Sequence, residues 1–115
     1  MRRKILNPTS LRTCHTVSEV FIKVFKDANH TLVAACDSEL IGQIFKEGRL
    51  KLEVKADFYR GDAVTISEAL HAVDKADIAN LVGKQIVQAA VTEGYVDPSA
   101  IIRIAGLPHV QILQL

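Results

Sequence analysis

The chain has 115 residues, of which 49% are hydrophobic and 23% charged, the composition of one globular domain. This composition excludes a disordered chain, a collagen and a coiled coil, and no apolar run reaches the ~18 residues that a membrane-spanning helix needs. The two cysteines, Cys14 and Cys36, are too few for a disulfide scaffold and too far apart for a C-x-x-C motif. We therefore expect an intracellular α+β domain that does not span a membrane.

Charge is distributed unevenly along the chain. Residues 19–60 carry seven charges of each sign, whereas residues 61–115 carry three basic and six acidic residues. Residues 1–18 contain no acid and four basic residues, Arg2, Arg3, Lys4 and Arg12. We expect residues 1–18 to be a disordered basic extension that adds weak, non-specific attraction to RNA. An organellar transit peptide and a start codon assigned too early are the alternatives.

The first half of the expected domain, which spans residues 19–115, opens with a hairpin. Residues 20–26 and 31–36 are rich in β-branched and aromatic side chains, and residues 27–30 between them have turn chemistry. A short helix is expected from residue 37 or 38 to residue 45, closed by Gly48. Residues 49–54 alternate in polarity, which predicts a strand with Leu50, Leu52 and Val54 facing inward.

Two helices and two strands are expected in the second half. Thr65 and Glu68 have the spacing of a capping box, which predicts a helix over residues 66–73. A second helix is expected from Asp74 or Asp77 onward, ending before Gly94. Strands over residues 101–105 and 110–115 follow, with a break at 106–108. The order β-β-α-β-α-α-β-β predicts a small α+β domain with a mixed or mainly antiparallel sheet and about three helices.

Asn80 and Gly83 are candidate binding residues on the second of these helices. A glycine inside a helix allows a ligand to approach closely, and an asparagine one turn earlier offers a donor and an acceptor. This arrangement indicates a small polar site near the helix N-terminus, suited to a phosphate or carboxylate. The alternative is tight packing of the helix at Gly83, with Asn80 bonded to a neighbouring loop.

His109 and Gln111 follow the sequence Gly106-Leu107-Pro108, which predicts a rigid turn. Such a turn would present His109 at a defined angle, as an acid–base group or as a hydrogen-bonding residue. His109 is therefore the one candidate for a catalytic role. The alternative is a histidine that stabilises its own turn.

Two other sets of residues have the types that nucleophilic catalysis or metal binding requires. Cys36 with His109 and Asn80 has the residue types of a thiol nucleophile, a base and an orienting group, but no nucleophile motif surrounds Cys36. Zinc ligation would need Cys14, His15, His30 and Cys36, whose spacing matches no zinc motif. We therefore predict no metal and no cofactor, and we expect Cys36 to be a small buried side chain.

One pattern favours RNA. Phe21, Lys23 and Phe25 place two aromatic rings and a cation on one face of the first strand, an arrangement that stacks nucleic-acid bases on a sheet. Since the chain has few aromatic residues, the alternative is that helices cover this face and that both rings are part of the core.

Several short motifs along residues 20–112 together resemble one known family. The two most specific are A-N-L-V-G at residues 79–83 and G-x-P-H-x-Q at residues 106–111. The others are C-D at 36–37, L-I-G at 40–42, F-K-E-G at 45–48, F-Y-R-G at 58–61, G-Y-V at 94–96 and I-R-I-A at 102–105. With these motifs the chain resembles the domain-of-unknown-function 424 family of archaeal proteins. Typical members begin close to the first strand, so residues 1–18 depart from the family pattern.

The resemblance implies an archaeal, cytoplasmic α+β protein and supplies no activity. It favours Asn80, Gly83, Gly106, Pro108, His109 and Gln111 as the binding residues. We therefore expect a non-catalytic binding module that contacts RNA or a ribonucleoprotein of the translation machinery, with Arg2, Arg3, Lys4, Arg12 and Lys23 adding attraction for nucleic acid. The acidic balance of residues 61–115 opposes this interpretation. The alternatives are a small-molecule-binding protein or enzyme that uses His109 as acid–base with Asn80, and a protein–protein adaptor.

Overall fold

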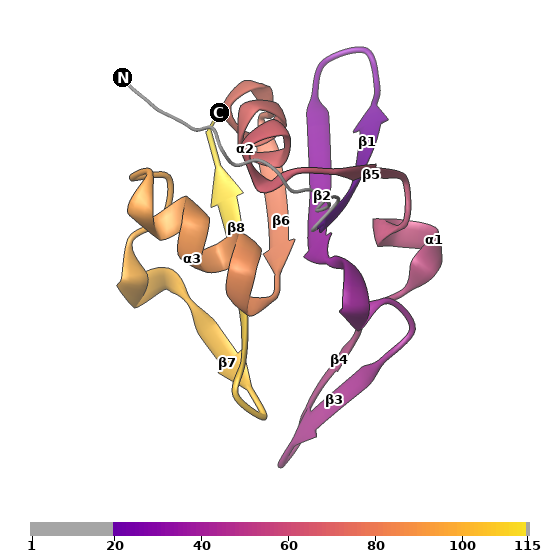
Figure 1. Cartoon of the computed structure of the whole chain (residues 1–115), viewed down its shortest axis with the longest axis vertical. Coiled ribbons are helices and arrows are strands. Elements are labelled where there is room, and N and C mark those ends of the chain that lie inside the picture. The colour runs from indigo at the N-terminus through magenta and orange to yellow at the C-terminus, as the bar shows by residue number, and fades with distance from the viewer. Residues whose placement is uncertain (1–19, 115) are drawn as a thin grey trace, which may run out of the picture.

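Six strands form one mixed sheet in the order β5-β1-β2-β6-β8-β7 in the computed structural model of the chain, which describes residues 20–114 (Figure 1). Strands β2 and β6 are parallel, and the other neighbouring pairs are antiparallel. The predicted fold class, a small α+β domain with a mixed sheet and three α-helices, is confirmed. The strands of the sheet are β1 (Val20–Lys26), β2 (Thr31–Asp37), β5 (Asp62–Val64), β6 (Ile78–Val82), β7 (Ile102–Ile104) and β8 (Leu107–Leu113).

Helices α2 (Ile66–Lys75) and α3 (Lys84–Thr92) cover one face of this sheet (Figure 1). Alternate residues of each strand point into this layer, because successive side chains of a strand point to opposite faces. The resulting core gains its stability from apolar surface removed from water. Its buried members include Val20, Ile22, Val33, Ala35, Leu70, Val73, Ala79, Leu81, Ile86, Val87, Ala90, Val110 and Ile112.

The opposite face of the sheet is covered only in part. Helix α1 (Ala56–Tyr59), the 3₁₀ helix η2 (Ser38–Leu40) and a separate hairpin of β3 (Ile44–Glu47) and β4 (Leu50–Glu53) contribute to a second, smaller core. Its buried residues are Ala34, Cys36, Leu40, Val54, Tyr59, Val82 and Leu107.

Local signals placed several element ends correctly. The Thr65 side chain accepts a hydrogen bond from the Glu68 N–H, and the Glu68 side chain accepts from the Thr65 N–H, as the predicted capping box requires. Gly94 has φ +85° directly after the end of α3, and the Tyr95 N–H donates to the carbonyl of Ala90. This is the expected glycine C-cap. No helix among residues 20–114 is both long and apolar enough to span a membrane.

The predicted second helix is wrong over residues 78–82, which form strand β6. Ala79 and Leu81 face the helical layer while Asn80 faces the other way, so the segment has a period of two. Helix α3 begins only after Gly83, whose φ of +121° is incompatible with a continuous helix. Parallel pairing with β2 therefore decides the structure of this segment.

The predicted helix over residues 38–45 is also wrong. Only η2 is helical, because Gly42 with φ +85° turns the chain and β3 then pairs with β4. Val54 is fully buried and Leu52 partly buried as expected, but Leu50 is 51% exposed. This difference arises because β4 pairs with β3 in a hairpin separate from the six-stranded sheet.

The break predicted at residues 106–108 lies one residue earlier. Ala105 and Gly106 have φ +52° and +82° and form a two-residue turn between β7 and β8. Pro108 and His109 already lie within β8, so a strand rather than a rigid turn orients His109.

Candidate functional site

The sheet face opposite α2 and α3 carries three rows of side chains that run across the central strands, and a further pair, Ile104 and Leu107, lies beyond the third row. We call this surface the open face. Strand register defines the rows. The first row holds Lys23, Ala34, Asn80 and Gln111; the second holds Phe25, Leu32, Ile78 and Leu113; the third holds Ala63, Phe21, Cys36, Val82, His109 and Ile102.

Helix α1 lies over the first row because that row contains a small residue. Ala34 is fully buried and leaves room for Tyr59, which packs in the same cluster. At the other side of α1, the Lys23 Nζ donates to the carbonyl oxygen of Asp57 at 2.7 Å. These contacts fix the Tyr59 hydroxyl above the centre of the sheet.

Tyr59, Asn80 and His109 form a hydrogen-bonded chain on the open face. The Tyr59 hydroxyl donates to Asn80 Oδ1 at 2.7 Å, and His109 Nε2 lies 3.1 Å from the same oxygen. Asn80 and His109 are partly buried, while Gln111, directly opposite Asn80 across the strands, is exposed. Three polar side chains from β6 and β8 therefore lie together beside the hydroxyl of α1.

Burial determines the protonation states of the Tyr59 hydroxyl and the His109 imidazole. It raises the pKa of the Tyr59 hydroxyl, with a smaller contribution from nearby Cys36, so Tyr59 stays protonated and able to donate. It lowers the pKa of His109 below 6.5, because the charged imidazolium loses hydration. At neutral pH the site therefore presents a neutral imidazole.

Aromatic rings continue the site toward β1. Phe25 and Phe58 are stacked with ring centroids 5.3 Å apart, and Phe58 meets Tyr59 edge to face at 4.9 Å. Lys23 Nζ lies 5.5 Å from the centroid of Phe25. On the next row, the Arg60 guanidinium lies 5.8 Å from the centroid of Phe21. Two cations thus accompany the aromatic side of the open face.

Of the two interpretations of the first strand, packing in the core applies to Phe21 and exposure on the surface applies to Phe25. Phe21 is partly buried against the second core, whereas Phe25 remains 36% exposed at the end of β1. Helices α2 and α3 cover the opposite face, and only the short helix α1 lies over this one. Phe25 is therefore a surface ring.

A hollow of about 410 Å³ lies over the second row of the open face. Along β6 its lining residue Ile78 is two positions before Asn80, so both side chains point to the same side of the sheet. Asn80 lies on the adjacent first row and His109 on the third row, and neither residue lines the hollow. It is lined by Phe25, Lys26, Asp27, His30, Leu32 and Ile78.

Gly83 serves the packing of α3. The buried Asp37 carboxylate accepts from the N–H groups of Gln85 at 2.9 Å and Ile86 at 3.0 Å, and so caps the helix. A Cβ at Gly83 would lie 2.6 and 2.7 Å from the two carboxylate oxygens. Asp37 therefore already occupies the helix end at which we had expected an external anion.

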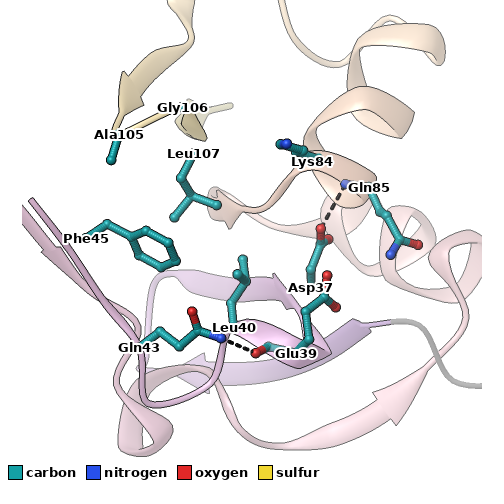
Figure 2. A pocket seen from close by; sticks show the side chains of 10 residues that line it. All are labelled: Asp37, Glu39, Leu40, Gln43, Phe45, Lys84, Gln85, Ala105, Gly106 and Leu107. Atoms are coloured by element: carbon teal, nitrogen blue, oxygen red, sulfur yellow. Dashed lines mark hydrogen bonds between the residues drawn. The ribbon is translucent and has the colours of Figure 1, made fainter.

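A second cleft, of about 500 Å³, lies beside that helix end (Figure 2). Leu40, Phe45 and Leu107 point into it from η2, β3 and β8, with Glu39 and Lys84 among its polar residues. The Glu47 carboxylate accepts from the Ala105 N–H at 2.6 Å and connects the β3–β4 hairpin to the β7–β8 turn. Neither Asn80 nor His109 lines this cleft.

The predicted binding residues therefore lie in two places. Asn80, His109 and Gln111 meet on the open face. Gly106 lines the second cleft, and the Gly83 N–H donates to the carbonyl of Pro108 at 3.0 Å near the start of α3. Arg2, Arg3, Lys4 and Arg12 lie outside the described residues.

Two residues of the open face were not identified as site residues from the sequence. Tyr59 and Phe58 lie on a four-residue helix that has no capping signal. The only sequence signal was the F-Y-R-G motif of the family resemblance.

Neither a thiol centre nor a metal centre emerges from the described residues. Cys36 is fully buried, and burial, with Asp37 and Glu39 as lesser causes, raises its pKa to about 12. No group of three or more histidine, cysteine, aspartate and glutamate side chains in residues 20–114 is arranged to hold a metal ion. Cys14 and His15 lie outside these residues.

Together these features define a class: a small α+β protein whose sheet is covered by helices on one face and carries aromatic and polar side chains on the other. Residues 25–115 match the family described as "Protein of unknown function (DUF424)", and the chain belongs to this family.

A solved structure has the same fold. It is described as an uncharacterized conserved protein from Methanopyrus kandleri, and it matches with a TM-score of 0.71 and 24% sequence identity, covering 84% of this chain and 91% of that one. A search of curated proteins found no match.

Proposed function

We propose that the protein is a non-catalytic module that binds single-stranded RNA on the open face. The observation that carries the proposal is the hollow over the second row, which the surface ring of Phe25 lines, on the same sheet face as the hydrogen-bonded Asn80 and His109. Proteins that bind single strands combine exposed aromatic rings, on which bases stack, with cations along the path of the backbone.

Charge on the open face is compatible with this function although residues 61–115 are acidic overall. None of the side chains in the three rows is a carboxylate, and Lys23 is among them. The hollow itself is lined by one carboxylate, Asp27, and one cation, Lys26. Glu68 and Asp74 lie on α2, in the layer on the opposite face. An RNA strand on the open face would therefore avoid a substantial part of the acidic charge.

We place this module in the archaeal cytoplasm, where it would bind RNA or a ribonucleoprotein of the translation machinery. The archaeal part of this setting is supported by the source of the fold neighbour. The basic residues 1–18 would add non-specific attraction to RNA, seen as a salt dependence of the affinity of the full chain.

The proposal is tested by fluorescence anisotropy of a labelled 12-nucleotide single-stranded RNA with the full chain and two neighbouring variants. Phe25→Ala removes the stacking ring, and we expect about a tenfold loss of affinity, within the range measured for base–aromatic contacts. Val24→Ala is the matched control, because Val24 is 44% exposed on the other side of the same strand. Its affinity should equal that of the wild type.

Two results would contradict the proposal. The first is no binding of RNA by the wild-type chain at low salt. The second is equal binding by the wild type, Phe25→Ala and Val24→Ala, since RNA would then bind elsewhere. With either result, the small-molecule and adaptor alternatives become the functions to test, beginning with metabolite screens against His109→Ala.

A further inference from the structure

The hydrogen bonds of Asn80 determine which nitrogen of His109 carries the proton. Asn80 Oδ1 accepts from the Tyr59 hydroxyl, and the same oxygen lies 3.1 Å from His109 Nε2. A carboxamide oxygen has lone pairs and no proton, so it can only accept. His109 Nε2 must therefore be the donor, and the neutral ring carries its proton there.

Two polar groups at this site then have no partner among residues 20–114. The second ring nitrogen, His109 Nδ1, is left with a lone pair and can only accept. The Asn80 Nδ2 amide group, on the far side of the shared oxygen, can only donate. Both residues are partly buried on the open face to which we assign the RNA, although neither lines the hollow.

We propose that His109 Nδ1 accepts a hydrogen bond from an N–H or O–H group of the bound RNA, and that Tyr59 is the positioning residue that fixes the required tautomer. This inference rests on the proposed function and names the atom through which the site recognises its ligand. RNA offers such donors on its bases, as amino and imino groups, and on its sugar, as the 2′-hydroxyl.

Tyr59 acts through Asn80 and does not need to touch the RNA. Its hydroxyl holds the carboxamide oxygen toward the centre of the site. Without that bond the Asn80 amide can turn over and offer its N–H₂ group to His109 Nε2. The imidazole would then carry its proton on Nδ1, and the acceptor for the RNA would be lost.

Two conservative substitutions separate recognition by Nδ1 from a structural role of His109. A glutamine side chain reaches the position of Nε2 and keeps the donor to Asn80, but it lacks an acceptor at Nδ1. An asparagine side chain ends at the level of Nδ1 and lacks the bond to Asn80. We expect His109→Gln to lower RNA affinity about tenfold and His109→Asn to stay within about threefold of the wild type.

A merely structural histidine predicts the opposite order, with His109→Gln retaining affinity and His109→Asn losing it. That order would overturn the inference while leaving RNA binding by the module intact. No RNA binding by the wild type would overturn both the inference and the proposed function. A matched 2′-deoxy strand identifies the donor group. If the wild type binds this strand more weakly than RNA, and His109→Gln lowers its affinity no further, the donor is the 2′-hydroxyl of the sugar. If His109→Gln lowers the affinity for the 2′-deoxy strand as much as for RNA, the donor is on a base.

The tautomer itself is read from the ¹⁵N chemical shifts of the His109 ring in the full chain. We expect a protonated Nε2 in the wild type and protonation of Nδ1 in a substantial fraction of Tyr59→Phe, with RNA affinity reduced in parallel. Tyr95→Phe is the control, because its hydroxyl contacts Asp74 in the helical layer. A protonated Nδ1 in the wild type would contradict the inference.

Discussion

The Tyr59 hydroxyl donates to Asn80 Oδ1 at 2.7 Å and joins a four-residue helix to the central part of the sheet. This bond lies within the second core, where Tyr59 is only 4% exposed. It therefore contributes to stability as well as to the geometry of the open face. Its loss affects both properties, and they can be measured separately.

Tyr59→Phe should lower the free energy of unfolding by about 1 kcal/mol, the net value of a hydrogen bond whose ring packing is retained. Urea unfolding followed by circular dichroism measures this change. Tyr95→Phe, which removes a 3.3 Å hydrogen bond between exposed groups, should change stability less. Equal losses in the two variants would contradict the view that the buried bond stabilises the fold.

Gly83→Ala should be among the most damaging single substitutions in the domain. The backbone at Gly83 has φ +121°, and its new Cβ would overlap the Asp37 carboxylate. We expect a loss of about 3 kcal/mol or more in the free energy of unfolding. Gly94→Ala is the control, since Gly94 has φ +85° but open space around the Cβ position, and should cost about 1 kcal/mol. Similar losses at both positions would exclude the overlap with Asp37 as the cause.

Asp37→Ala should destabilise the start of α3. The substitution leaves the N–H groups of Gln85 and Ile86 without their carboxylate partner, which costs about 2 kcal/mol or more. Thermal unfolding of the full chain measures the loss. At the exposed cap Asp97, which accepts from Ser99 N–H, the same substitution should cost less than about 1 kcal/mol. A harmless Asp37→Ala would refute this role.

The stability of the fold should depend on pH through His109. Burial lowers its pKa in the folded state, so between that value and the ordinary 6.5 the unfolded chain binds more protons. The contribution of His109 is therefore complete above pH 6.5 and is lost as pH falls below it. Unfolding free energies of the wild type and His109→Gln from pH 5 to 8 test this, and the wild type should show the steeper fall. Parallel curves would contradict the prediction.

How far the sequence predicts this fold depends on whether a signal is local. The β1–β2 hairpin, the capping box of Thr65 and Glu68, and the end of α3 at Gly94 all follow from a few adjacent residues, and the structure confirms them. Strand β6 does not, because its I-A-N-L-V segment is apolar enough for either a helix or a strand. Its conformation is decided by pairing with β2, more than forty residues earlier in the chain.

The candidate site shows the same dependence. Asn80, His109 and Gln111 were singled out from the sequence, but a helix and a rigid turn were the wrong elements to carry them. They meet because Asn80 pairs with Gln111 and Val82 with His109 across antiparallel strands. The contribution of Tyr59 depends on a contact across 21 residues and on the small side chain of Ala34 beneath it. No local pattern encodes such a contact.

The most direct test of the central claim is to follow the ¹H–¹⁵N spectrum of the full chain while a single-stranded RNA is added. Binding on the open face predicts the largest shifts at the side-chain amides of Asn80 and Gln111 and at the backbone of Phe25 and His109. Residues of the second cleft, such as Lys84 and Gln85, should change little. Shifts concentrated at that cleft, or no shifts at all, would contradict the account.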